Sequence, residues 1–147
     1  MSKKLTALGN KFIRTGHAVS SKYKRLSKDV AAEYDLKVCE MDILMSLERC
    51  KTAQTVRDVS RDTGYSKGMI SRCVYSLKQS GYVTVEHDTV DRRAVQIELT
   101  DKSTPVIALF HEKASSFIET LYAGLSDADL QALDQLMDTV LANTEDM

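Results

Sequence analysis

A tight turn between two short amphipathic segments constrains the fold of this 147-residue chain more than any other feature. Residues 55–63 begin with a threonine and stop at Gly64, and residues 66–80 begin with a serine and stop at Gly81. Serine and threonine are preferred helix N-caps, and glycine is preferred where a helix ends in a left-handed residue. The pattern therefore predicts two helices joined by a tight turn. Four apolar residues share one face of the second helix and are expected in the core: Ile70, Cys73, Val74 and Leu77.

Two alternating segments follow the second helix. Apolar and polar residues alternate in residues 83–88 and 94–99, which is typical of strands with one buried face. The residues that join them, 89–93, are mostly charged. Helix, turn, helix and hairpin together predict a winged helix-turn-helix, mainly α with a small β-hairpin wing. Such a unit can place a helix end in the major groove of DNA and an arginine in the neighbouring minor groove.

The other faces of the second helix carry residue types that bind DNA. Its first turn has free N–H groups and the positive end of the helix dipole, which favour an anion. Arg72 can contact guanine with two hydrogen bonds or hold a phosphate, and the sequence does not choose between them. Gly68 is a poor helix former, which fits a close approach to DNA as well as a neutral surface position. In the wing, Asp91 can orient Arg93 for a narrow minor groove.

The two ends of the chain carry apolar stripes and opposite charges. Residues 1–29 hold eight Lys or Arg and one Asp, a net +7, whereas residues 125–147 hold six Asp or Glu and no Lys or Arg, a net −6. Helical periodicity runs through residues 5–30, 106–121 and 130–141. The apolar surface of these stripes is larger than the helix-turn-helix and hairpin between them can cover, which favours a homodimer. Solvated end helices are the alternative reading of the charges.

Composition narrows the class of protein. Apolar residues make up 43% and charged residues 28% of the chain, as in an ordinary globular protein, neither disordered nor membrane-spanning. The N-terminus lacks an apolar signal core, so a cytoplasmic location is expected. Three cysteines without CxxC spacing indicate reduced thiols and no zinc site. No cofactor is expected, and no catalytic motif is present, which predicts that the protein is not an enzyme.

The segments Ser66-Lys-Gly-Met-Ile-Ser-Arg72 and Asp88-Thr-Val-Asp-Arg-Arg-Ala-Val-Gln-Ile-Glu-Leu-Thr100 resemble the MarR family of bacterial transcriptional regulators. The resemblance extends over nearly the whole chain. It implies one domain of residues 1–147, an interlocked homodimer with dimerisation helices in 1–33 and 103–147 and a DNA-binding module in 38–100. It also implies a pseudo-palindromic operator, and repression that a small-molecule effector or thiol oxidation relieves.

The same resemblance implies which residues bind DNA, by their positions in the two motifs. The family commonly has Ala and Leu where this chain has Ser60 and Thr63, which predicts looser packing of the first module helix. The implied DNA-binding residues are Ser66, Lys67, Gly68, Ser71, Arg72, Asp91, Arg92 and Arg93.

The sequence gives less information about the signal to which such a regulator would respond. His17, Met41 and Met45 can line an effector pocket, because methionines suit irregular cavities, or they can simply fill the core. Cys39 lies near a helix start, which can activate a thiol, but a small buried residue is the plainer interpretation. Isolated histidines match no metal-ligand spacing. The alternative function is a winged-helix protein- or RNA-interaction module without an operator, and the basic residues of the second helix and the wing argue against it.

Overall fold

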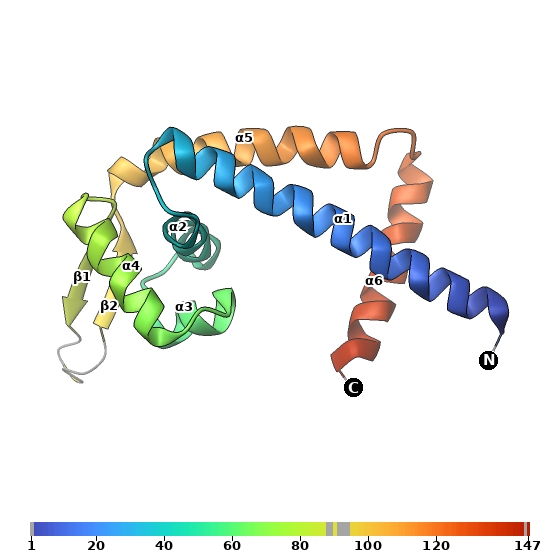
Figure 1. Ribbon diagram of the computed structural model, residues 1–147, viewed down its shortest axis with the longest axis horizontal. Helices are drawn as coiled ribbons and strands as arrows, with labels where there is room; N and C mark the ends of the chain where they lie inside the picture. Colours follow the sequence, from blue (N-terminus) through green and yellow to red (C-terminus); the bar gives the residue numbers. More distant parts are fainter. Residues whose placement is uncertain (1, 88–89, 91–94, 146) are drawn as a thin grey trace. The chain divides into compact units, whose positions relative to one another are not determined.

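The computed structural model describes residues 2–87, 90, 95–145 and 147. The predicted wing residues Asp91, Arg92 and Arg93 lie outside this part of the chain. Two compact units are present, Met1–Ala114 and Ser115–Met147. The first contains α1 (Lys3–Glu33), α2 (Val38–Cys50), α3 (Val56–Thr63), α4 (Lys67–Gln79), β1 (Val83–His87), β2 (Val95–Leu99), a 3-10 turn (Asp101–Ser103) and most of α5 (Thr104–Leu121). The second contains α6 (Asp127–Glu145) (Figure 1). Across the described residues, no helix is long and apolar enough to span a bilayer.

Helix α3 starts and stops where the sequence predicts. The Thr55 hydroxyl oxygen accepts a hydrogen bond from the Asp58 N–H at 3.1 Å, and the Asp58 carboxylate accepts from the Thr55 N–H at 3.0 Å. This reciprocal pair satisfies two N–H groups that a helix end leaves without partners. Gly64 ends the helix with a φ of 78°, a conformation in which other residues are strained.

Helix α4 follows after a short turn. Ser66 caps it, since its hydroxyl oxygen accepts from the Met69 N–H at 3.2 Å, and Gly81 lies just beyond its end with a φ of 82°. The four residues predicted for its apolar face are all buried: Ile70, Cys73, Val74 and Leu77. The predicted helix, turn, helix arrangement is confirmed.

The two strands form an antiparallel hairpin in which Val83 faces Leu99 and His87 faces Val95. Ile97 is fully buried. It also pairs with Gln54, which precedes α3: the Gln54 N–H donates to the Ile97 carbonyl at 3.1 Å, and the Ile97 N–H donates to the Gln54 carbonyl at 2.8 Å. This bridge ties the hairpin to the start of the helix-turn-helix. This bridge cannot be read from the sequence pattern, because a single paired residue has no periodicity.

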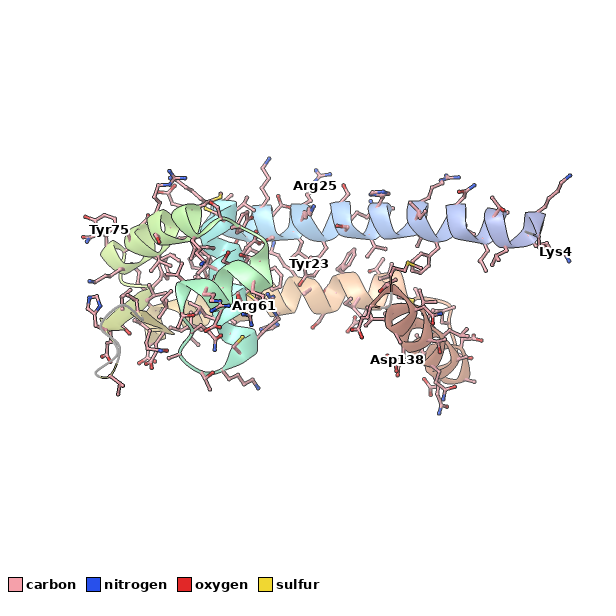
Figure 2. The ribbon with its side chains drawn as sticks, turned by 90° about the horizontal axis from the view of Figure 1, so that it is seen from below. Lys4, Tyr23, Arg25, Arg61, Tyr75 and Asp138 are labelled. Atoms are coloured by element: carbon pink, nitrogen blue, oxygen red, sulfur yellow. The ribbon has the colours of Figure 1, made fainter. Side chains whose placement is uncertain are left out.

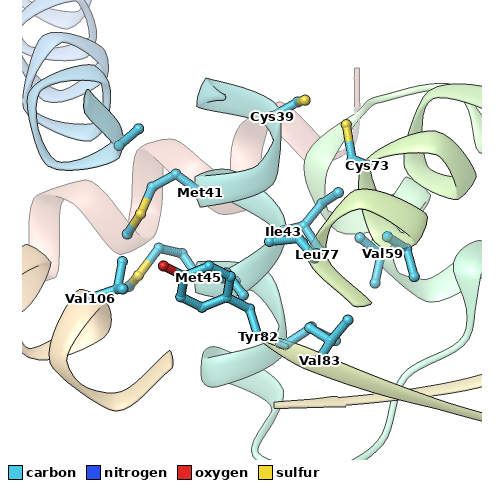
Figure 3. Packing of buried hydrophobic residues seen from close by; sticks show 14 of the residues in the cluster. Cys39, Met41, Ile43, Met45, Val59, Cys73, Leu77, Tyr82, Val83 and Val106 are labelled. Carbon is cyan, nitrogen blue, oxygen red and sulfur yellow. The ribbon is translucent and has the colours of Figure 1, made fainter. Parts of the chain in front are cut away.

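Helix α2 supplies the centre of the core. Met41, Ile43 and Leu44 are fully buried, and α2 contacts α1, α3, α4 and β2. Figure 3 shows Met41 and Met45 directed toward Val106 of α5 and Ile43 directed toward Leu77 of α4. Helix α2 is therefore the element against which α1, α3, α4 and β2 pack.

Helix α1 is one continuous helix of 31 residues. Its last third joins the core through Ser27, Val30 and Ala31, and the Tyr23 ring meets the Phe110 ring edge-on with centroids 5.7 Å apart (Figure 2). In its first half, four large apolar residues are exposed: Leu5, Leu8, Phe12 and Ile13.

The second unit is built around α6. Ser126 caps it: the Ser126 hydroxyl oxygen accepts from the Asp129 N–H at 3.1 Å, and the Asp129 carboxylate accepts from the Ser126 N–H at 2.9 Å. The described residues of α6 include none that is buried. Four large apolar residues in its second half are exposed: Leu136, Met137, Val140 and Leu141.

Candidate nucleic-acid interface

The outward face of α4 carries the predicted DNA-binding residues. Lys67, Gly68, Ser71 and Arg72 are all exposed, and we call these four residues with Ser66 the recognition surface. Tyr75, one turn after Ser71, is 66% exposed and points away from the core (Figure 2). Because the opposite face is buried, these side chains are held in place by a packed helix rather than by a loop.

The start of α4 is suited to an anion. Its first turn contains Lys67 and no acidic residue, and the helix N-terminus adds a partial positive charge. Ser66 already accepts a hydrogen bond in the cap, but its hydroxyl can still donate to a phosphate. At Gly68 an added Cβ would meet no atom within 4 Å, so within the free protein nothing demands glycine at this position.

Two carboxylates of α2 hold α4 and the turn that precedes it. Glu40 is buried; its side chain accepts hydrogen bonds from the Ser76 hydroxyl of α4 and from the Lys37 N–H, each at 3.2 Å. Asp42 accepts from the Tyr65 hydroxyl, just before α4, at 2.5 Å. The sequence pattern does not reveal either contact, because the partners are distant in the chain and the periodicity of α2 indicates only its apolar face. A carboxylate next to buried positions of that face is the signal that could have indicated these residues.

The turn between α3 and α4 is held by hydroxyl groups. The Ser60 hydroxyl donates to the Tyr65 carbonyl at 2.7 Å, and the Thr63 hydroxyl donates to the Val59 carbonyl at 2.7 Å. The Thr63 oxygen also accepts from the Tyr65 N–H at 3.3 Å. Where the family commonly has apolar residues, this chain thus stabilises the turn with local hydrogen bonds.

A thiol pair lies under the recognition surface. Cys39 of α2 and Cys73 of α4 are buried and not disulfide-bonded, and their sulfur atoms face each other (Figure 3). Burial and a hydrogen bond with Cys39 raise the pKa of the Cys73 thiol to about 12. Cys73 therefore stays protonated at neutral pH. Cys50, by contrast, is exposed.

The three residues predicted for an effector pocket lie in different environments. His17 is exposed on α1, whereas Met41 and Met45 are buried in the core of the first unit. The two methionines thus fill the core in the single chain, and an effector pocket at these residues stays a prediction.

Comparison with known sequences identifies the helix-turn-helix. Residues 41–87 match the family model of the IclR helix-turn-helix domain. The chain is 22% identical over 127 residues to the HTH-type transcriptional repressor IacR of Pseudomonas putida, covering 86% of this chain and 75% of IacR. It is 27% identical over 99 residues to the uncharacterized HTH-type transcriptional regulator YfiV of Bacillus subtilis, covering 67% of this chain and 61% of YfiV.

Comparison with solved structures extends to nearly the whole chain. A MarR family protein from Bacillus stearothermophilus matches with a TM-score of 0.78 and 16% identity, covering 99% of both chains. BpsR of Bordetella bronchiseptica, solved in work on regulation of its DNA binding by 6-hydroxynicotinic acid, matches with a TM-score of 0.63 and 20% identity, covering 86% of this chain and 90% of BpsR. By structure, this chain is a winged helix-turn-helix protein of the MarR fold.

Proposed function

We propose that this protein is a transcriptional regulator that binds double-stranded DNA in a sequence-specific way through α4 and the wing. The observation that carries the proposal is the recognition surface. It combines an exposed, capped helix N-terminus with Lys67 and Arg72, and the opposite face of the same helix is anchored in the core. A protein-binding module would not need basic side chains at this helix start.

The regulator acts as a homodimer in this proposal. Exposed apolar stripes on the first half of α1 and along α6 support it, because contiguous exposed apolar surface marks an interaction site. Residues 1–33 and 103–147 then form the dimer, and residues 38–100 form the DNA-binding module. A two-fold dimer reads a pseudo-palindromic operator whose half-site centres lie about one helical turn apart.

Repression relieved by a small-molecule effector is the proposed mode of action. IacR is named a transcriptional repressor, and the DNA binding of BpsR is regulated by 6-hydroxynicotinic acid. Release requires only that the effector binds better to a conformation of the dimer that does not fit the operator. Asp91, Arg92 and Arg93 complete the proposed DNA contact from the wing, with Asp91 orienting Arg93.

A pair of Arg72 variants tests the DNA-binding proposal. The purified protein is titrated with the DNA upstream of its own gene and with unrelated DNA, each at two salt concentrations. Arg72→Ala should weaken operator binding by about tenfold or more, since one good base or phosphate contact contributes about 1–3 kcal/mol. Arg72→Lys keeps the charge and loses the two-pronged hydrogen bond. It should bind unrelated DNA normally and lose operator preference if Arg72 contacts a base.

The outcome also separates the two roles of Arg72. If Arg72→Lys matches the wild type on both DNAs while Arg72→Ala is weaker on both, the arginine holds a phosphate. Wild-type protein that binds no DNA at low salt, or that binds without any preference for its upstream sequence, contradicts the proposal.

A further inference from the structure

Asp42 connects three elements that are distant in the sequence. One of its carboxylate oxygens accepts a hydrogen bond from the Ser27 hydroxyl of α1 at 3.1 Å. The other accepts from the Tyr65 hydroxyl at 2.5 Å. Tyr65 lies in the turn between α3 and α4, directly before Ser66, the N-cap of α4. A single side chain thus joins the long helix α1 to the start of the recognition surface.

The surroundings of Asp42 make this connection specific. Its neighbours in α2, Met41 and Ile43, are fully buried, and Ser27 is only 5% exposed. A half-buried carboxylate destabilises the fold unless its oxygens receive hydrogen bonds. Both oxygens do here, each from a different element, so a shift of either donor leaves part of the carboxylate unsatisfied.

The electrostatics keep Tyr65 in the donor role. Its hydrogen bond to Asp42, followed by burial, raises the pKa of the Tyr65 hydroxyl well above its ordinary value. Tyr65 therefore stays a neutral donor at neutral pH. The Tyr65 backbone is fixed as well, because its carbonyl accepts from Ser60 and its N–H donates to Thr63. The side chain and the backbone of this residue together set where α4 begins.

From this geometry we infer that Asp42 is a positioning residue that couples helix α1 to the recognition surface. The inference rests on the proposed function and deepens it. Movement of α1, the proposed dimer helix, pulls on Ser27 and is passed through Asp42 to Tyr65 and the N-terminus of α4. A change in the dimer can in this way change how well the recognition surface fits DNA, without an effector touching α4.

A double-mutant cycle tests the coupling. Ser27→Ala and Tyr65→Phe each remove one hydroxyl, and the two hydroxyls bond to different oxygens of Asp42. Tyr65→Phe should weaken operator binding about tenfold, and Ser27→Ala a few fold, as expected for hydrogen bonds to a charged group. The double variant should lose less than the product of the two effects, because the contacts cooperate. In an Asp42→Ala background neither substitution should have any further effect.

Matched controls separate positioning from general stability. Tyr34→Phe removes the same hydroxyl atom from a tyrosine at the end of α1 that takes no part in this network, and it should bind the operator like the wild type. Asp42→Asn keeps an acceptor for Tyr65 and should retain most of the affinity that Asp42→Ala loses. All binding is measured at a temperature at which thermal melts show each variant fully folded, so loss of stability alone leaves the affinity unchanged.

A measurement on the free protein keeps the inference testable apart from DNA binding. Amide hydrogen exchange is followed at Met69 and Ile70, whose N–H groups bond to the Ser66 hydroxyl and the Ser66 carbonyl. Ser27→Ala should speed exchange there although Ser27 lies in α1, and Tyr34→Phe should not. Unchanged exchange in Ser27→Ala contradicts the coupling even when the wild type binds its operator. So does a result in which the effects of Ser27→Ala and Tyr65→Phe on operator binding are independent and persist in the Asp42→Ala background. If the wild type binds no operator, the proposed function fails, and exchange alone decides the coupling.

Discussion

Helices α4 and α6 have the same kind of sequence pattern, but the apolar face of α4 is buried and that of α6 is largely exposed. Each is amphipathic, and each begins with a serine cap. In α4, Ile70 and Leu77 are completely buried, whereas in α6 Leu136 is 64% and Leu141 is 61% exposed. The period of apolar residues therefore tells that a helix has a face to bury, but not whether the same chain covers it. For α4 the chain does; for α6 we propose that a second copy does.

Helix α1 combines both situations in one element. Val30 is fully buried and packs in the core, while Leu8, six turns earlier at about 3.6 residues per turn, is 62% exposed. The change occurs along an uninterrupted helix, so a rigid rod extends from the core of the DNA-binding module into the proposed dimer interface. The proposed coupling from α1 through Ser27 to the recognition surface requires a continuous helix of this kind.

The largest expected effect comes from charging the exposed stripe of α6. Leu141→Asp should weaken the homodimer by about 100-fold or more, because a charge in the buried centre of an interface is strongly unfavourable. Operator binding should be lost with it. Asn143→Asp introduces the same residue about 200° around the helix and should leave the dimer intact. Sedimentation velocity over a range of concentrations measures both, and equal behaviour of the two variants would show that this stripe lies in no interface.

A smaller effect is expected when substitutions on the two faces of α4 are compared by their free energy of unfolding. Leu77→Ala should cost about 2–5 kcal/mol, since it leaves a cavity in a packed core. Tyr75→Ala removes a larger side chain that is 66% exposed, and it should change stability by no more than about 0.5 kcal/mol. Urea unfolding measures both. If Tyr75→Ala is as destabilising as Leu77→Ala, then Tyr75 is covered by something other than solvent, and the exposed face of α4 ends before this residue.

The smallest effect concerns the cap of α3 and its dependence on pH. The Thr55 N–H and hydroxyl hydrogen bonds lower the pKa of the Asp58 carboxyl. The carboxylate therefore contributes to stability above its ordinary pKa of about 3.9, and the contribution is lost as the pH falls through the lowered value. Thr55→Ala should cost about 1 kcal/mol at neutral pH. NMR titration should show the Asp58 pKa moving only part of the way back up, because the alanine keeps the backbone N–H bond, which is the larger cause of the shift. An unchanged pKa in Thr55→Ala contradicts the contribution of the Thr55 hydroxyl.

Many of the helix ends could be predicted from local signals. The caps at Thr55, Ser66 and Ser126 and the stops at Gly64 and Gly81 are set by chemistry within a few residues, so spacing alone locates them. The buried face of α4 follows from helical period in the same way. The Gln54–Ile97 bridge, the Glu40–Ser76 hydrogen bond and the two hydrogen bonds of Asp42 could not be predicted, because their partners lie 15 to 43 positions away and carry no periodic signal.

The sequence by itself determined which segments are helices, where they begin and end, and which residue types are offered to DNA at the start of α4. These properties depend on short-range hydrogen bonding and on the fixed period of the backbone. Only the tertiary structure decided which apolar faces the chain covers itself, that Met41 and Met45 lie in its core while His17 lies outside it, and that Cys39 meets Cys73. It also decided that Asp42 joins α1 to the recognition surface. Such pairings depend on how packed helices bring distant residues together, and the free energy of that packing is a sum over contacts that no local pattern records.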